Sequence, residues 1–284
     1  MIKLGLIGCG SWGKNYLATI EQMEGVEVSA VWTKDKGPRS LQSIDGVIIA
    51  TPPDTHAELA LRALETYRIP VLLEKPATLD LQSTQKVLQA AEATGVPLLV
   101  NHIQLFSEPF LELRRLAREM GNFTVSSLAG NTGPFRKYSS LWDWGPHDVS
   151  MCLSLFDQPP NQHLTTAVRY TADSGGVVDV VNLVFGSDTT ATLKFGNGLR
   201  KKVRHFTVKF ESHGGEIVYE DCSFTPLRVN GIAVGVEREP PLQNVVEAFV
   251  KGIQTGETDW RWSPYLVEET ARILTLVDKI TVAS

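Results

Sequence analysis

The first hundred residues alternate short, continuously apolar runs with segments in which apolar residues recur at helical spacing. Residues 12–23 have this spacing, and two further segments, at about 54–65 and 81–93, are also expected to be helical. Five apolar runs are expected to be strands: 2–7, 26–32, 46–50, 71–73 and 97–100. Strands that are apolar throughout and separated by helices are typical of a parallel sheet covered on both faces.

The pattern changes after residue 100. A helix is expected at about 109–120, and the segments that follow alternate apolar and polar residues, as strands with one buried face do. These strands are expected at 123–130, 165–170, 177–185, 189–195, 203–210 and 216–219, and helices at about 242–254 and 264–280 close the chain. The pattern therefore predicts an α/β fold, with a doubly wound parallel sheet in residues 1–101. A second, α+β domain with a largely antiparallel, open sheet is expected in residues 102–284.

The composition is that of an ordinary globular protein. The 284 residues include 27 Lys and Arg against 32 Asp and Glu, a formal net charge of −5. A negative chain without a long basic segment is a poor candidate for non-specific nucleic-acid binding. No apolar run reaches the roughly 18 residues that would span a bilayer, and the first residues lead into a strand rather than a signal peptide. Three widely separated cysteines exclude a disulfide framework, so we expect a soluble, cytoplasmic protein.

A glycine-rich motif follows the first expected strand. Gly8, Gly10 and Gly13 form G-x-G-x-x-G, and Ser11 and Trp12 open the helix that follows. In this position the first glycine allows a tight turn, and the second lets a pyrophosphate approach the backbone. The third glycine lets the helix pack closely on the strand. The motif predicts dinucleotide binding; a glycine-rich turn without a ligand is the alternative.

Another candidate segment is Glu74-Lys75-Pro76, which follows the fourth expected strand. It lies at the carboxyl edge of the sheet, where ligands of such folds bind. Lys75 could act on a substrate there or be a solvated surface charge. Glu74 is close enough in sequence to pair with a nearby cation.

The third candidate is the segment 142–148, with the sequence W-D-W-G-P-H-D. Proline disfavours helix at the residue before it and suits the first turn of a helix, so a helix is expected from Pro146 to about residue 156. His147 would then lie at the positive end of that helix, which favours the neutral imidazole. Asp143 would lie outside the helix but could fold back towards it. A neutral histidine near a carboxylate suits acid–base catalysis; a helix cap beside a surface histidine is the alternative.

Together these motifs resemble the Gfo/Idh/MocA family of NAD(P)-dependent oxidoreductases. Thr51, Pro52 and His56 are similar to the family's T-P-x-x-x-H turn, and with Glu74 and Lys75 they are expected in the cofactor site. The resemblance implies a Rossmann domain joined to a domain with an open antiparallel sheet. Because that sheet often serves as the oligomer interface in the family, we expect a homo-oligomer.

The same resemblance implies the chemistry. Lys75 would contact the reacting hydroxyl, His147 would be the acid/base, and Asp143 would orient the substrate or His147. The W-D-x-x-P-H pattern looks most like family members that act on nucleotide-linked sugars. The expected reaction is hydride transfer between NAD(P) and a carbinol carbon of a sugar, nucleotide-linked sugar or cyclitol. The alternatives are an imine or enone reductase on the same scaffold and a non-catalytic, NAD(P)-binding regulatory protein.

The segment after the second strand bears on the choice between NADP and NAD. NAD-selective sites usually place an acid there to bind the ribose hydroxyls. Here Thr33 and Lys34 occupy that point and Arg39 follows, which favours the 2′-phosphate of NADP over NAD, although Asp35 is also near. The segment 34–45 is too short for the helix and strand that relatives usually insert at this place.

Most of the remaining polar residues are expected to have structural roles, and His102, after the fifth expected strand, could either border the substrate cleft or be a hydrogen-bonded structural residue. The histidines outside the motifs have no metal-ligand spacing, so no metal is expected. Arg200, Lys201, Lys202 and Arg204 form a basic cluster, expected on a solvated sheet edge, with a phosphate contact as the alternative. Ser150 stands where members of the family commonly have an acid.

Overall fold

The computed structural model describes residues 1–33, 43–133, 138–156, 162–171, 175–185, 189–211, 214–237 and 239–283. Contacts divide the chain into two compact units. The first comprises Met1–Phe106 and Glu239–Ala271, and the second comprises Ser107–Arg238 and Arg272–Ser284.

The first unit is built on a five-stranded parallel sheet with the strand order β2-β1-β3-β4-β5. Its strands are β1 (Ile2–Ile7), β2 (Val26–Trp32), β3 (Gly46–Ile49), β4 (Val71–Glu74) and β5 (Leu98–Asn101). All four pairings between neighbours are parallel. β3 and β4 are buried along their whole length, as their continuous apolar runs predict.

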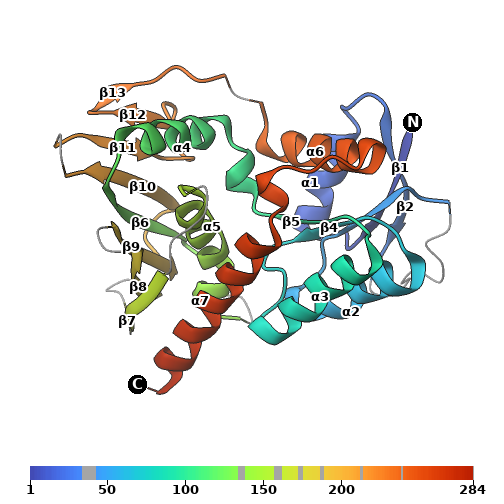
Figure 1. The fold of residues 1–284 in the computed structure, drawn as a ribbon, viewed down its shortest axis with the longest axis horizontal. Coiled ribbons are helices and arrows are strands. Elements are labelled where there is room, and N and C mark those ends of the chain that lie inside the picture. Colours follow the sequence, from blue (N-terminus) through green and yellow to red (C-terminus); the bar gives the residue numbers. More distant parts are fainter. Residues whose placement is uncertain are drawn as a thin grey trace. The chain divides into compact units, whose positions relative to one another are not determined.

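Helices cover both faces of this sheet, which confirms the predicted doubly wound arrangement (Figure 1). One face carries α1 (Ser11–Ile20) and α6 (Pro241–Thr255), and the other carries α2 (His56–Leu61) and α3 (Leu81–Thr94). Shorter helical turns span Pro53–Thr55, Arg62–Tyr67, Ile103–Phe106 and Trp260–Trp262. Local sequence sets the ends of α3: the Asp80 carboxylate accepts a hydrogen bond from Ser83 N at 2.8 Å, and Gly95 ends the helix in the left-handed conformation.

Helix α6 belongs to the first unit, whereas the sequence-based boundary after residue 101 places it in the second domain. Gly46, in β3, leaves room for it: a Cβ there would lie 3.0 Å from the Phe249 ring and 2.7 Å from the Ile253 side chain. Phe249 also stacks on Trp262, with ring centroids 6.3 Å apart. The apolar face of α6 is visible in the sequence, but the sheet against which it packs is not.

The second unit contains an eight-stranded open sheet with the order β13-β12-β11-β10-β6-β9-β8-β7. Its strands are β6 (Phe123–Asn131), β7 (Gln162–Thr171), β8 (Val177–Phe185), β9 (Thr189–Asn197), β10 (Val203–Phe210), β11 (Glu216–Tyr219), β12 (Leu227–Val229) and β13 (Ile232–Ala233). Only β6 and β9 pair in parallel; the other pairs are antiparallel. The predicted, largely antiparallel sheet is therefore confirmed.

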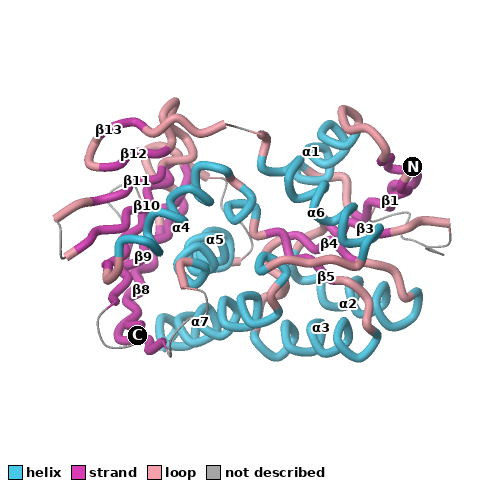
Figure 2. The backbone as a smooth tube through the Cα atoms, turned by 45° about the horizontal axis from the view of Figure 1, so that its top comes forward, coloured by secondary structure: helices cyan, strands magenta, loops and turns pink. Residues whose placement is uncertain are grey.

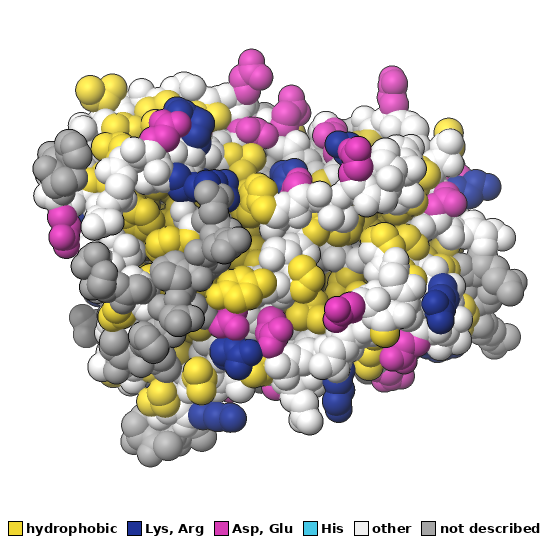
Figure 3. Space-filling view, in the orientation of Figure 1, with side chains coloured by type: hydrophobic (Ala, Val, Ile, Leu, Met, Phe, Trp, Pro, Cys, Tyr) yellow, Lys and Arg dark blue, Asp and Glu magenta, His cyan; other side chains and the backbone are white. Residues whose placement is uncertain are grey.

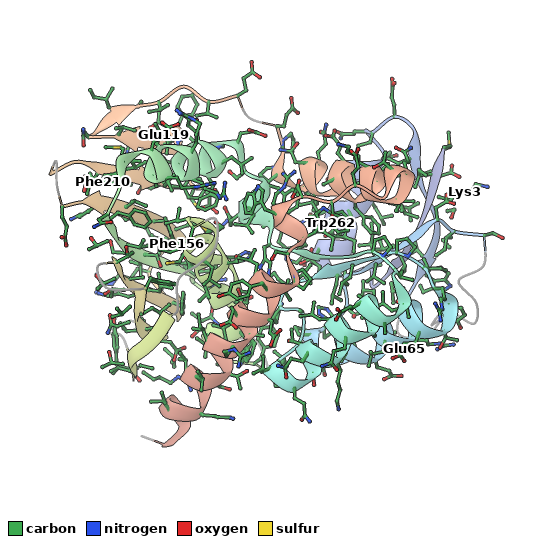
Figure 4. The ribbon with its side chains drawn as sticks, viewed as in Figure 1. Lys3, Glu65, Glu119, Phe156, Phe210 and Trp262 are labelled. Atoms are coloured by element: carbon green, nitrogen blue, oxygen red, sulfur yellow. The ribbon has the colours of Figure 1, made fainter. Side chains whose placement is uncertain are left out.

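Helices α4 (Glu108–Met120) and α5 (Ser140–Ser154) lie along one face of this sheet (Figure 2). α5 packs on β6, β8 and β9, and α4 packs on β11 and β12. An aromatic cluster fills the core beyond the end of α5, where the Phe123 ring centroid lies 5.7 Å from that of Phe156 and 6.3 Å from that of Phe210. Phe156 and Phe210 are labelled in Figure 4. The last helix, α7 (Pro264–Ala283), contributes its first residues to the first unit and its later residues to the second.

The opposite face of the second sheet carries no helix among the described residues (Figure 2). On β7, Val168 is 53% exposed and Tyr170 is 46% exposed. Asn182 of β8 links the neighbouring strands through hydrogen bonds with Thr166 and Thr192, at 2.6 and 2.8 Å. This face therefore combines exposed apolar side chains with a short polar ladder.

Candidate active site

The predicted cofactor residues lie at one edge of the parallel sheet. Parallel strands end at the same edge, and ligands of doubly wound sheets bind there, at the point where the strand order reverses, here between β1 and β3. The residues at this edge are Gly8, Gly10, Ser11, Trp12 and Gly13 after β1, Thr33 after β2, Thr51 and Pro52 after β3, and Glu74 and Lys75 at the end of β4. Lys34 and Arg39 lie outside the described residues.

The glycine loop has the backbone geometry that its motif predicts. Gly8 has a φ of +99°, which glycine adopts without steric cost. A Cβ on Gly13 would lie 2.1 Å from the carbonyl oxygen of Gly8, so a side chain there would push α1 away from β1. A Cβ on Gly10 would meet nothing within 4 Å, because the space beside it is open.

This loop fits a bound pyrophosphate. Gly10 is the N-cap of α1, no side chain caps the helix, and its first turn carries no acidic residue. The positive end of the ten-residue helix therefore has neither a capping side chain nor an acidic residue of its own first turn, and the space beside Gly10 is open among the described residues. Ser11 is exposed and Trp12 is half-buried at the same turn.

Glu74 is buried, at 4% exposure, and its carboxylate is engaged by neighbouring side chains. Its Oε1 accepts hydrogen bonds from the Tyr16 hydroxyl and the Asn101 amide, both at 2.7 Å, and its Oε2 accepts one from Lys75 N at 3.3 Å. Burial raises the pKa of Glu74, and the hydrogen bonds oppose that shift. Burial and the adjacent carboxylate raise the pKa of Tyr16. The cluster thus ties α1, β4 and β5 together at the strand end that carries Lys75.

His56 links two loops of the same edge. Its ring nitrogens lie 2.8 Å from the Pro76 carbonyl oxygen and 2.9 Å from that of Thr51, and the residue is completely buried. Burial lowers the pKa of His56, while the two carbonyl contacts oppose this shift. We infer that His56 and Glu74 serve the predicted cofactor site by holding its loops in place rather than by direct contact.

The helix that carries His147 begins earlier than the sequence predicts. α5 starts at Ser140, so Pro146 lies inside it rather than at its first turn. His147 is therefore in the third turn, and the predicted effect of the helix N-terminus on its imidazole is wrong. The reason is tertiary packing. Nearly every residue of α5 is buried, and a Cβ on Gly145 would lie 2.6 Å from the Leu274 side chain, so this burial outweighs the hydrogen bond that proline removes.

Asp143 and His147 lie one turn apart on α5. Residues four positions apart share a helix face, so the helix itself brings these side chains together, and Asp143 does not have to fold back from a loop. Both residues are buried, at 4% and 6% exposure. Ser150, at the position where the family commonly has an acid, donates a hydrogen bond to the His147 carbonyl oxygen at 2.9 Å. Its hydroxyl thus contacts the helix backbone.

The residues of the basic cluster at 200–204 differ in their exposure to solvent. Arg200, Lys201 and Lys202 are exposed, as predicted. The prediction of a solvated Arg204 is wrong: it is 2% exposed. The alternation along β10 is the signal that could have placed it, because every second residue from Arg204 onward faces the helices and the other three are Phe206, Val208 and Phe210.

The Glu74 cluster has no such signal. No sequence pattern identifies Tyr16 and Asn101 as partners of Glu74.

The described residues also bear on whether the chain has a metal site, a membrane-spanning helix or a surface patch of one charge. Within the described ranges, no group of three or more His, Cys, Asp and Glu side chains is placed to hold a metal ion. No helix in the described part of the chain is long and apolar enough to cross a membrane. On the face drawn in Figure 3, cationic and anionic side chains of the described residues are interspersed rather than gathered by sign. This distribution agrees with the small net charge.

Known oxidoreductases resemble this chain in sequence. Residues 37–102 match the sequence profile of the Gfo/Idh/MocA oxidoreductase family, which is described as having an NAD-binding Rossmann fold. Inositol 2-dehydrogenase 2 of Saccharopolyspora erythraea is 26% identical over 204 residues, which make up 62% of this chain and 59% of that protein. The match therefore spans less than two thirds of the length of this curated relative.

Solved structures match nearly the whole chain. A candidate oxidoreductase from Magnetospirillum magnetotacticum MS-1 is 31% identical, with a TM-score of 0.82 over 96% of this chain and 98% of that one. A mutant of KijD10, a 3-ketoreductase from Actinomadura kijaniata solved with TDP-benzene and NADP, shares the fold. It is 20% identical, with a TM-score of 0.83 over 99% of this chain and 98% of that one. With its glycine loop and two-unit architecture, the chain belongs to the Gfo/Idh/MocA family of oxidoreductases, and its residues 37–102 match the NAD-binding Rossmann fold of that family.

Proposed function

We propose that this protein transfers a hydride between NAD(P) and a carbinol carbon of a sugar, a nucleotide-linked sugar or a cyclitol. The observation that carries the proposal is the pair of buried residues Asp143 and His147 on successive turns of α5. Oxidation of an alcohol requires removal of the hydroxyl proton, and a histidine near a carboxylate is suited to accept it. The inositol dehydrogenase and 3-ketoreductase relatives support a polyhydroxylated substrate.

The residues that would hold the cofactor are those at the edge of the parallel sheet. The backbone at Ser11 and Trp12, at the start of α1, would bind the pyrophosphate, and the open space at Gly10 would admit it. Thr33 is exposed after β2, the strand end at which this fold binds the adenosine ribose. Thr51 follows β3 at the same edge. When bound, the nicotinamide accepts or supplies the hydride.

Three side chains would accept the substrate proton, stabilise the developing charge and orient the reacting groups. In alcohol oxidation His147 accepts the hydroxyl proton on an imidazole nitrogen and later releases it to solvent. Lys75 stabilises the negative charge that develops on the substrate oxygen, an electrostatic role that often accounts for much of such catalysis. Asp143 orients the substrate or the imidazole.

A homo-oligomer and a cytoplasmic location complete the proposal. The second sheet has helices on one face and exposed apolar side chains, including Val168 and Tyr170, on the other. Exposed apolar patches often mark interaction surfaces, so we expect this sheet face to join two copies of the chain. Light scattering at micromolar concentration tests the assembly, and a monomer would contradict it.

The cytoplasmic location is supported by the cysteines. The three cysteines are not joined in disulfides, which suits a reducing compartment.

We expect NADP to bind more tightly than NAD. Thr33, Lys34 and Arg39 occupy the segment in which NAD-selective sites place an acid, and a hydroxyl with two cations suits a 2′-phosphate. Fluorescence titration of the protein with NADPH and NADH measures both dissociation constants. Tighter binding of NADH would show that the segment after β2 selects the other cofactor.

Alanine at two glycines of the loop should have different effects. Gly13→Ala should lower the free energy of unfolding by about 1–3 kcal/mol, because its Cβ would overlap the Gly8 carbonyl oxygen. Gly10→Ala should leave stability nearly unchanged, because its Cβ meets nothing within 4 Å, but it should weaken NADPH binding by intruding on the pyrophosphate. Urea denaturation and NADPH titration of both variants measure this. Normal NADPH binding by Gly10→Ala would argue against a pyrophosphate at this loop.

Replacement of His147 tests the reaction directly. With NADP+ or NAD+ and a panel of inositols, free sugars and nucleotide-linked sugars, we expect wild-type turnover that falls as the pH is lowered, because the neutral imidazole is the proton acceptor. His147→Ala should lower kcat by roughly 10²–10⁴-fold and lose this pH dependence, with cofactor affinity little changed.

Lys75→Met is the matched variant for that experiment. It should also lower kcat, but it should keep the pH dependence, because Lys75 stabilises charge and does not take the proton. Near-normal turnover with an unchanged pH profile in His147→Ala would rule out the assigned proton transfer.

A further inference from the structure

Arg204 of β10 is among the largest fully buried side chains in the described part of the chain. Its Nη1 lies 3.3 Å from Asp148 Oδ2, and its Nε lies 3.2 Å from Asp221 Oδ2. The carbon of its guanidinium lies 5.4 Å from the ring centroid of Trp144. Its Nη1 also lies 3.8 Å from Met151 Sδ. One buried cation therefore contacts three residues of α5 and one residue that follows β11.

Stability alone does not account for this arrangement. Removing two ionised groups from water is costly, and apolar residues of similar volume often stabilise a core as well as a buried ion pair does. Burial raises the pKa of Asp148 to about 6, and the Arg204 guanidinium opposes that shift. A charged, planar guanidinium holds its partners in a defined orientation, whereas an apolar contact tolerates rotation.

Two of the α5 residues that contact Arg204 are next to the candidate catalytic pair. Trp144 directly follows Asp143, and Asp148 directly follows His147. Each residue of a helix is turned by about 100° from the one before it. The face held by Arg204 and the face that carries the candidate catalytic pair are therefore about 100° apart on the same two turns, and fixing one fixes the other.

The same part of α5 is weakened by its own sequence. Pro146 has no N–H to donate to the Trp142 carbonyl, and proline inside a helix favours a kink. The contacts of Arg204 lie on either side of this proline. Trp144 is also held from a second direction, because its Nε1 donates a hydrogen bond to Asn197 Oδ1 at 3.2 Å. These contacts restrain a helix segment that would otherwise bend.

We propose that Arg204 is a positioning residue for α5. It holds Trp144 and Asp148, and so it sets the rotation of the helix. That rotation determines the direction in which Asp143 and His147 face. The proposal rests on the proposed function, in which His147 takes the substrate proton. An arginine with a structural role alone would contribute to the free energy of unfolding without changing the behaviour of the imidazole.

The experiment compares Arg204→Met with Phe206→Leu in the whole protein. Methionine removes the charge and the planar fork but keeps an apolar side chain in the core. Phe206 is the matched control, because it is also buried on β10 and faces the same way, but its aromatic partner is Phe110 of α4, with ring centroids 6.1 Å apart. Urea denaturation identifies conditions under which both variants are fully folded, and the assays are made there.

We expect Arg204→Met to lower kcat by roughly ten- to a hundredfold, because a small misplacement of a reacting group can cost about 10²-fold. The KM for the cofactor should not change, and the pH dependence of kcat should shift. Arg204→Lys keeps the charge but lacks the fork, so it should recover only part of kcat. Phe206→Leu should keep the wild-type kcat and pH dependence. Wild-type kcat and pH dependence in Arg204→Met would overturn the proposal.

An NMR measurement that needs no turnover separates this proposal from the proposed function. The His147 imidazole resonances, assigned by their absence from His147→Gln, should titrate differently in Arg204→Met but not in Phe206→Leu. If wild-type turnover does not depend on His147, the proposed function fails, and the same NMR difference still supports positioning by Arg204. Unchanged His147 resonances in Arg204→Met would overturn the positioning role of Arg204. If Arg204→Met does not fold, Arg204→Lys, the milder change, replaces it in both measurements.

Discussion

The parallel pairing of β1 with β3, and of β3 with β4, is the constraint on which the cofactor site depends. These strands run in one direction, so the glycine loop, the turn at Thr51 and the segment at Lys75 all leave the same edge of the sheet. β3 and β4 are buried along their whole length, and burial on both faces requires continuous apolar runs. The pattern that makes the sheet therefore also brings these loops together.

Buried polar side chains hold the candidate residues in both units. Glu74 joins three elements of the first unit at the strand end that carries Lys75. In the second unit, Asp148 and Arg204 join α5 to the sheet, next to His147. Burying such groups is costly unless they are paired, but paired groups impose directions that apolar contacts do not. In both units, part of the available stability is given up for defined geometry.

Helix α5 shows how packing can override a local rule. Proline normally begins a helix, and a helix starting at Pro146 would have put His147 at its positive end. The helix starts six residues earlier because almost every side chain from Ser140 to Ser154 is buried. The electrostatic argument for the imidazole changes as a result. The surroundings of His147 come from the neighbouring turn and the packed core, not from the helix end.

The sequence by itself determined the order and type of most elements, the glycine loop, and the positions of Lys75, Asp143 and His147 along the chain. These features depend on side-chain periodicity and on motifs a few residues long, which act locally. Tertiary structure decided the start of α5, the membership of α6, and the partners of Glu74 and of Arg204. Each of these depends on contacts between distant segments, such as Arg204 with Asp148, 56 positions away. Periodicity shows which face of an element is buried, but only packing selects the surface that covers it.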